Sequence, residues 1–337
     1  MRWDGQGVGV DDGALPGLQR IGFVRTVHTP QFDGITFHEV LCKSALNKVP
    51  NAAQLPFRFT VNGYRGCSHA CRYCFARPTH AYLDFDTGAD FDSQVVVKTN
   101  VVDVLRRELT RPSWTRETVA LGTNTDPYQR AEGRYALMPG IIGALADSGT
   151  PFSILTKGTL LRRDLALIAD AADHVDVSVA ISLAVADPEL HQEVEPGTPG
   201  PRARLELIKA VRGAGLDCHV MVAPVLPSLT DSQEHLDGLL GQIAAAGASS
   251  VTVFALHLRG ATRGWFMSWL ATAHPELVAT YCELYGRGAY LPASYREMLQ
   301  RRVAPLVVKY GLNRDQRSFR AVPAPLAAVP EPELTLF

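Results

Sequence analysis

The sequence predicts an α/β protein built around a partial or complete β/α barrel of six units. Short apolar or β-branched runs alternate with amphipathic, helix-like segments through the middle of the chain. The last four of these runs are almost continuously apolar, which is typical of strands covered on both faces. Alternating strands and helices favour right-handed βαβ units and a parallel sheet. A doubly wound open sheet is the alternative fold.

We expect six strands, at residues 57–61, 119–122, 152–156, 175–182, 218–222 and 250–256. Helices are expected between them, at residues 101–109, 139–146, 204–211 and 233–246. Pro139 suits the first turn of one helix and Gly149 follows its end, while the polar segment 230–232 suits the start of another. In such folds the functional groups lie just after the carboxyl ends of the strands.

The parts of the chain outside this core differ in character. Residues 1–50 show little periodicity and are interpreted as an N-terminal extension, ahead of a core at 51–258. Residues 259–320 are expected to be helical, aromatic and basic, with ten Lys and Arg against four Asp and Glu, a local net charge of +6. Residues 321–337 contain four prolines and are expected to form a flexible tail.

The whole chain is nearly neutral, with 33 Lys and Arg against 34 Asp and Glu in 337 residues. That balance excludes a strongly cationic nucleic-acid coat protein. We find neither a signal peptide nor an apolar run of about 18 residues, so we expect a cytoplasmic protein that makes no use of a membrane. In a reducing compartment, clustered cysteines indicate metal binding or catalysis before disulfides.

Three of the six cysteines, Cys67, Cys71 and Cys74, lie in one eight-residue window after the first expected strand. Thiolates are soft ligands, and one short loop can direct several of them at one metal centre. A four-iron cluster normally takes four cysteines, so three would leave one iron open to a cofactor or to chemistry. Two alternatives stay open: a structural zinc site completed by His69 or His80, and a redox cluster completed by Cys42 or Cys218.

This C-x3-C-x2-C window, with the aromatic Tyr73 before its last cysteine, resembles the signature of the radical S-adenosylmethionine (SAM) superfamily. A wider set of motifs resembles spore photoproduct lyase-like proteins, often called DNA repair photolyases, and most of all an actinobacterial branch of unassigned substrate. The motifs are VNGYRGC at 61–67, CFARPTH at 74–80, LGTNTDPY at 121–128, LTK at 155–157 and VAP at 222–224. The resemblance covers about residues 40–310.

The resemblance implies a partial (β/α)6 barrel and a definite chemistry. In this superfamily three thiolates, here Cys67, Cys71 and Cys74, hold a [4Fe-4S] cluster, and SAM chelates the fourth iron. One electron cleaves SAM to methionine and a 5′-deoxyadenosyl radical, which abstracts hydrogen from the substrate. The substrate is unidentified, and a nucleic-acid lesion is one candidate. An external one-electron reductant of the flavodoxin or ferredoxin type is implied as a partner.

The resemblance also implies positions for SAM. Tyr73 would lie near the adenine, and the polar segment after the second strand would accept the SAM amino group. Lys157 would lie near the carboxylate, and Ser182 would contact the ribose. The segment consists of Thr123, Asn124, Thr125 and Asp126. Each position has a plain alternative, namely packing for the tyrosine, an Asn/Asp turn, a solvated lysine, and a core hydroxyl bonded to the main chain.

One position departs from the lyase pattern. Spore photoproduct lyase uses a cysteine after the second strand as hydrogen donor, and Thr123 stands at or near that place here. A threonine O–H bond is too strong to replace it, so the closing step of that enzyme is not supported. We expect Cys218, at the start of its strand, to be a buried structural thiol, and Cys42 and Cys282 to be small packed side chains.

Two further features have open interpretations. The sequence Glu195-Pro196-Gly197-Thr198 also resembles the lyase pattern, and it could position a cofactor or substrate or only form a turn. The segment 259–320, with His257, Arg259 and Arg263 near the barrel mouth, could bind nucleic acid through phosphates and stacked bases. A packed helical cap is the plain alternative, and an anionic small molecule would suit the same arginines. Outside the enzyme class, the alternative is a non-catalytic metal-binding module that recognises nucleic acid.

Overall fold

A computed structural model of the chain describes residues 16–19, 21–50 and 55–313, so the expected tail at 321–337 lies outside the described residues. Its main sheet has seven strands in the order β11-β10-β9-β8-β7-β4-β3. Six of them are parallel and match the six predicted strands: β4 (Phe59–Val61), β7 (Val119–Leu121), β8 (Phe152–Thr156), β9 (Val177–Ser182), β10 (Cys218–Val225) and β11 (Ser250–Ala255). The short β3 (Leu46–Lys48) pairs antiparallel with β4.

The strand order decides between the two folds that the sequence allowed. The six parallel strands lie side by side in the order in which they occur along the chain, so the order never reverses as it does in a doubly wound sheet. Right-handed crossovers then place all the connecting helices on one side, as in a β/α barrel. Among the described residues β3 and β11 are the two edges and no ladder joins them, so the barrel is a partial one.

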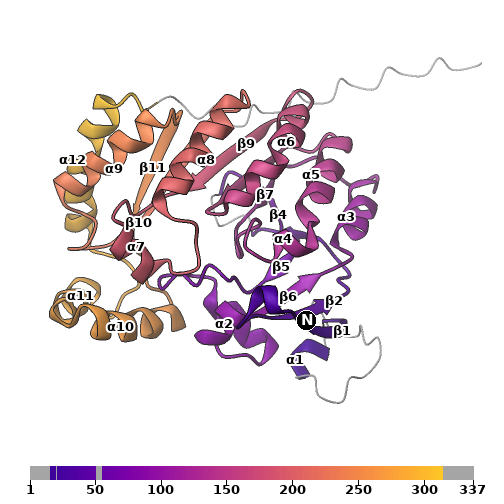
Figure 1. The fold of residues 1–337 in the computed structure, drawn as a ribbon, viewed down its shortest axis with the longest axis horizontal. Helices are drawn as coiled ribbons and strands as arrows, with labels where there is room; N and C mark the ends of the chain where they lie inside the picture. Colours follow the sequence, from indigo (N-terminus) through magenta and orange to yellow (C-terminus); the bar gives the residue numbers. More distant parts are fainter. Residues whose placement is uncertain (1–15, 20, 51–54, 314–337) are drawn as a thin grey trace, which may run out of the picture.

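The helices follow the outer side of this curved sheet in one arc (Figure 1). They are α3 (Val101–Leu109), α5 (Leu137–Asp147), α6 (Leu165–Ala172), α8 (Pro201–Gly213), α9 (Gln233–Ala245) and α12 (Ala293–Lys309). Four of them confirm the predicted helices, with α5 and α8 two to three residues longer at one or both ends. The structure adds α6 and the short elements α4 (Glu132–Tyr135), η4 (Thr159–Asp164) and α7 (Pro188–Val194).

A second sheet, which the sequence did not predict, lies next to the carboxyl end of β4, below the main sheet in the view of Figure 1. Its order is β1-β2-β6-β5, formed by β1 (Phe23–His28), β2 (Thr36–Val40), β6 (Gln94–Lys98) and β5 (Tyr64–Arg65). Short elements surround it: α1 (Pro16–Gln19), η1 (Pro30–Phe32), η3 (Arg77–Leu83) and α2 (Ala89–Ser93). The sheet joins strands on both sides of residue 50, and the division into an extension and a core stays a prediction. Because β5 ends just before Cys67, this sheet supports the cysteine loop.

The described part of the expected C-terminal segment, residues 259–313, is helical, as predicted, and residues 314–320 lie outside the described residues. It consists of α10 (Ala261–Ala273), η5 (Pro275–Leu277), α11 (Val278–Tyr285) and α12. Phe266, Tyr281 and Tyr285 are buried, and the two tyrosine hydroxyls donate to main-chain carbonyls of Pro227 and Leu256. Most of its aromatic side chains therefore pack against the barrel. None of the helices in the described ranges has both the length and the apolar character needed to cross a membrane.

The attachment of the edge strand β3 to helix α3 can be tested. Glu108 on α3 is buried, and its Oε2 accepts hydrogen bonds from the main-chain N–H groups of Ala45 (2.9 Å) and Leu46 (2.8 Å). Glu108→Ala removes the carboxylate that accepts from two main-chain donors, so it should lower the free energy of unfolding in urea by about 2–4 kcal/mol. Glu283→Ala, at an exposed position of α11, should change it by less than about 0.5 kcal/mol. Equal losses in the two variants would contradict the anchoring role.

Candidate functional site

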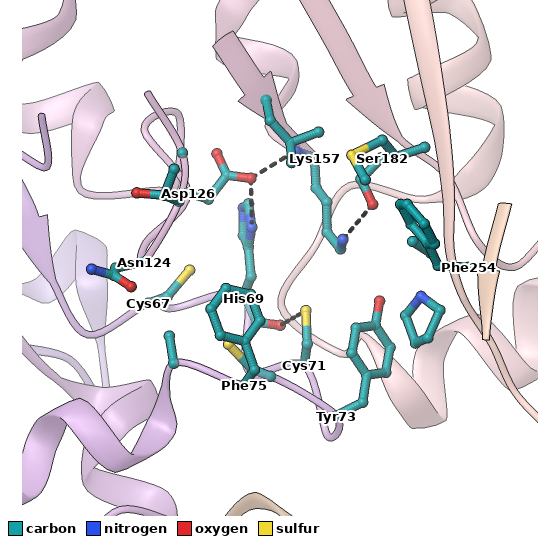
Figure 2. A pocket seen from close by; sticks show the side chains of 18 of the residues that line it. Cys67, His69, Cys71, Tyr73, Phe75, Asn124, Asp126, Lys157, Ser182 and Phe254 are labelled. Atoms are coloured by element: carbon teal, nitrogen blue, oxygen red, sulfur yellow. Dashed lines mark hydrogen bonds and ion pairs between the residues drawn. The ribbon is translucent and has the colours of Figure 1, made fainter. Parts of the chain in front are cut away.

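A cavity of ≈ 550 Å³ opens at the carboxyl ends of the parallel strands (Figure 2). The cysteine loop forms one wall, and the segments that follow β7 to β11 form the others. The cavity brings together every metal-binding and cofactor-binding candidate of the sequence analysis, which are Cys67, Cys71, Cys74, Tyr73, Thr123, Asn124, Thr125, Asp126, Lys157 and Ser182. These residues come from the cysteine loop and three separate strand ends, so the fold creates one polar site from dispersed segments.

A buried arginine holds the cysteine loop in shape. Arg77 has no exposed side chain, and its guanidinium donates to the main-chain carbonyls of Cys71 (2.9 Å) and Gly88 (2.7 Å) and pairs with Asp92 (2.8 Å). The guanidinium also lies near two aromatic rings, 5.3 Å from the centroid of Phe91 and 4.7 Å from that of Trp265 on α10. The loop conformation therefore depends on contacts from outside the loop.

The C-terminal helices contribute a second contact to the loop. Thr262 on α10 is buried, and its hydroxyl donates to the carbonyl of Cys74 at 3.1 Å. Together with Trp265, it attaches the end of the cysteine loop to α10. The helical segment thus forms part of the wall behind the site.

The three thiols share the cavity without converging on one point. Cys67 and Cys71 are buried and Cys74 is half-buried, and among the described residues no three His, Cys, Asp or Glu side chains are placed to hold a single metal ion. A zinc site needs all its ligands about 2.0–2.3 Å from one centre, whereas the thiolates of an iron–sulfur cluster each bind a different iron. Three thiolates on one short loop are the type of donor that the separate irons of such a cluster take.

Of the alternative fourth ligands, His69 lines the cavity and contacts the thiol of Cys67, whereas His80, Cys42 and Cys218 do not line the cavity. The ring of His69 pairs through Nδ1 with Asp126 (3.3 Å), and the ring of His80 lies 2.8 Å from the carbonyl of Gln94. Cys42 and Cys218 are buried away from the cavity, as predicted for packed thiols, and burial raises the pKa of Cys218 to about 12. The expectation for Cys282 was wrong, because this side chain is exposed on α11.

The segment after β7 is shaped by one glycine and one carboxylate. Gly122 has a φ of +94°, and a Cβ there would lie 2.0 Å from the carbonyl oxygen of Leu155, so only glycine fits. The Asp126 carboxylate accepts hydrogen bonds from the Thr156 hydroxyl (2.5 Å) and the Lys157 main-chain N–H (2.6 Å). Burial raises the pKa of Asp126, but His69 and these donors lower it below its usual value. Asp126 thereby joins β7, β8 and the cysteine loop.

Lys157 is a cavity residue and not a solvated surface lysine. Its side chain is 14% exposed, and Nζ donates to the hydroxyl of Ser182 at 2.6 Å (Figure 2). Nζ also lies 5.8 Å from the ring centroid of Tyr73. The Ser182 hydroxyl thus has a side-chain partner in place of the main-chain partner of the plain alternative.

Two further charged residues, Glu195 and Arg204, lie behind this wall; the sequence left Glu195 open between positioning and a turn and did not single out Arg204. The Glu195 carboxylate is fully buried and accepts from the Tyr73 hydroxyl and from Nη2 of Arg204 (2.5 Å). Burial raises the pKa of Glu195, but the charges of Arg204 and Lys157 outweigh it and lower the pKa to about 2. A sequence signal existed for Arg204, because it occupies the apolar stripe 204, 207, 208, 211 of its helix.

The mouth of the cavity is aromatic and cationic. Phe75 and Phe254 line it and are 64% and 49% exposed. Arg259 also lines it, with its guanidinium 4.8 Å from the ring centroid of the exposed Tyr290. Arg263 does not serve the mouth as expected, because its guanidinium donates to the carbonyls of Gly286 and Gly288 within the helical segment.

Comparison with known proteins agrees with the fold. The sequence model of the Radical SAM superfamily matches residues 61–240. The protein Rv2578c of Mycobacterium tuberculosis is 77% identical over the full length of both chains. The protein ORF301 of Acidianus two-tailed virus is 26% identical and matches 75% of this chain and 86% of that one.

Solved structures show the same fold. Spore photoproduct lyase complexed with dinucleoside spore photoproduct superposes with a TM-score of 0.62 over 81% of this chain and 79% of that one, at 14% identity. A variant of that lyase with bound AdoMet and dinucleoside spore photoproduct gives 0.59 over 79% and 76%, also at 14% identity. The chain is therefore an enzyme of the radical SAM superfamily with the fold of spore photoproduct lyase.

Proposed function

We propose that Cys67, Cys71 and Cys74 hold a [4Fe-4S] cluster and that the adjoining cavity binds SAM. The observation that carries this proposal is the meeting of three thiols from one loop with the polar ends of β7, β8 and β9 in a single cavity. When bound, the cluster and SAM would supply a 5′-deoxyadenosyl radical that abstracts hydrogen from the substrate. Membership of the superfamily implies both groups and an external reductant, for which a flavodoxin or ferredoxin is the expected class.

Two sides of the cavity suit the two charged groups of SAM, which are its carboxylate and its amino group. Lys157 supplies a cation at the end of β8, which would orient a carboxylate. The carbonyl, amide and hydroxyl groups of the segment 122–126 supply acceptors for an amine, and Ser182 supplies a hydroxyl for a sugar. Apolar side chains close the remaining wall and exclude water from this region: Leu155, Met221, Ala223, Pro224 and Leu256.

For the substrate, the mouth favours a planar group carrying an anion. Exposed Phe75 and Phe254 can stack a ring, and Arg259 can bind a phosphate or carboxylate. A nucleic-acid lesion meets this description, and a nucleic acid could extend over the basic helical segment. Among the described residues, the thiols that line the cavity are the three proposed cluster ligands. With Thr123 in the wall, the closing step of the lyase has no thiol donor.

Replacing one proposed ligand tests the enzyme proposal. Anaerobic reconstitution with iron and sulfide, followed by dithionite and SAM, should yield 5′-deoxyadenosine from the wild type. Cys71→Ala removes one of three thiolates, so its yield should fall to the background without protein. Cys218→Ala changes an equally buried thiol outside the cavity and should keep the wild-type yield. A wild type without product, or a Cys71→Ala variant with full yield, would contradict the proposed cluster on these three thiols.

Lys157→Met tests the proposed carboxylate contact. A hydrogen bond to a charged group contributes about 1.5–3 kcal/mol, so the dissociation constant of SAM should rise about 10- to 100-fold. Equilibrium dialysis with labelled SAM on the reconstituted protein measures it. Lys309→Met, which removes an exposed lysine paired with Asp237, should bind SAM like the wild type. Unchanged affinity in both variants would remove Lys157 from the site.

The nucleic-acid substrate has its own test. Ultraviolet-treated oligonucleotides should bind with an affinity that falls as salt rises, and Arg259→Ala should weaken this binding about 10-fold through loss of an ionic hydrogen bond. Chromatography of the digested oligonucleotide then follows the lesion. An undiminished lesion under conditions in which SAM is cleaved would turn the search to anionic small molecules.

A further inference from the structure

A fully buried ion pair lies directly behind the cavity wall. Glu195 follows α7 and Arg204 belongs to α8, and neither side chain has any exposed surface or lines the cavity. Arg204 also donates to the main-chain carbonyls of Ser182 and Pro199, both at 2.9 Å. A buried ion pair rarely stabilises a fold more than an apolar pair would, because both charges lose their hydration. Its location beside the cavity therefore points to a role in the site.

The other oxygen of the same carboxylate contacts two walls of the cavity. Oε1 of Glu195 accepts from the hydroxyl of Tyr73, on the cysteine loop, and lies 3.9 Å from Nζ of Lys157, at the end of β8. Lys157 in turn donates to Ser182 at the end of β9. One immobile carboxylate thus fixes the relative positions of an aromatic ring and a cation that both face the cavity.

The loop that carries Glu195 is attached to the cysteine loop along its main chain. The N–H of Arg72 donates to the carbonyl of Val194 (2.9 Å), and the N–H of Gly197 donates to the carbonyl of His69 (3.1 Å). A Cβ on Gly197 would lie 2.0 Å from the carbonyl oxygen of Ser68, so the two loops approach as closely as glycine allows. Any displacement of Glu195 would therefore be shared by the cysteine loop.

The charges of Glu195, Arg204 and Lys157 sum to a net positive charge, which lies on the side of the cavity. Arg204 balances Glu195, and the remaining positive charge belongs to Lys157, the member that lines the cavity. An amide in place of the carboxylate would leave two cations facing each other in a region of low dielectric constant, where they repel strongly. The amide also keeps only one acceptor oxygen, so either Tyr73 or Arg204 would meet an NH2 group in place of its acceptor. Both changes alter the wall that the proposed SAM site uses.

We propose that Glu195 is a positioning residue for SAM binding, which holds Tyr73 and Lys157 in place and uses Arg204 as its buried counterion. This inference rests on the proposed function, since it needs the cavity to bind SAM. It assigns a role to the Glu-Pro-Gly-Thr sequence, which the sequence analysis left open between positioning and a turn. Glu195 acts through other residues and is not itself expected to touch SAM.

The chain contains a matched control. Glu132 is also fully buried between a tyrosine and an arginine: it accepts from the Tyr64 hydroxyl at 2.5 Å and from Nη2 of Arg163 at 2.7 Å. Its carboxylate additionally accepts from the main-chain N–H groups at the start of α5. None of these three residues lines the cavity. Substitution of Glu132 therefore removes a buried carboxylate that joins a buried tyrosine to an arginine, here one that is 34% exposed, at a place outside the proposed SAM site.

The experiment compares paired double variants, which avoid leaving an arginine buried without a counterion. Glu195→Gln with Arg204→Met is set against Glu132→Gln with Arg163→Met, each reconstituted with iron and sulfide. Two readouts are the dissociation constant of SAM from equilibrium dialysis and the change that SAM causes in the electron paramagnetic resonance spectrum of the reduced cluster. We expect about 10- to 100-fold weaker SAM binding for the Glu195 pair at wild-type iron content. The Glu132 pair should bind SAM like the wild type despite lower stability.

Two single variants keep the test informative if the double variant does not fold. Tyr73→Phe removes only the hydroxyl that Glu195 accepts, and Glu195→Asp keeps the charge but shortens the side chain. Both should weaken SAM binding. Wild-type affinity in the Glu195 double variant or in both single variants would overturn the inference while leaving the proposed function intact. A wild type that binds no SAM would overturn the proposed function itself.

Discussion

The ion pair between Asp126 and His69 holds the cysteine loop against the open end of the sheet. Asp126 follows β7 and already accepts hydrogen bonds from the hydroxyl of Thr156 and the N–H of Lys157 at the end of β8, while His69 lies between two of the cysteines. One buried carboxylate therefore sets the distance between the thiols and two strand ends. The cavity, the direction of Lys157 and the approach of Tyr73 to the Glu195 loop all follow from this placement, because each depends on the loop lying where His69 keeps it.

The central fold was predictable because its signals are local. Each parallel strand is a short apolar run, and the helices between them have apolar stripes with start and stop residues, so six strands and four helices could be recognised without knowledge of their partners. The second sheet could not be recognised in this way. In β1 most side chains are exposed, and β5 has only two residues, so neither gives a hydrophobic pattern. β5 forms because the distant strand β6 supplies its hydrogen bonds, and β1 pairs with β2, which β6 holds in the same sheet.

The same distinction applies to the site. The three cysteines lie within one loop, so their spacing alone predicts soft-metal chemistry, and strand-end rules predict that Asp126 and Lys157 lie near them. Glu195 meets Tyr73 across 122 residues of sequence, a pairing that no local pattern encodes. The plain alternatives for Lys157 and Ser182 also failed for a tertiary reason, since each side chain is the other's partner across neighbouring strands. The expectation for Cys282 was wrong for a different reason, because a cysteine on a helix gives no local sign of whether it faces solvent.

The contacts of α10 with the cysteine loop have a consequence for the order of assembly during synthesis. The hydroxyl of Thr262 bonds to the carbonyl of Cys74 across 188 residues, and Trp265 covers the guanidinium that shapes the loop. A nascent chain that has left the ribosome only as far as β10 already carries all three cysteines, but it lacks the helix that closes their wall. The wall behind the cysteine loop is therefore complete only once α10 has been synthesised, long after the loop itself.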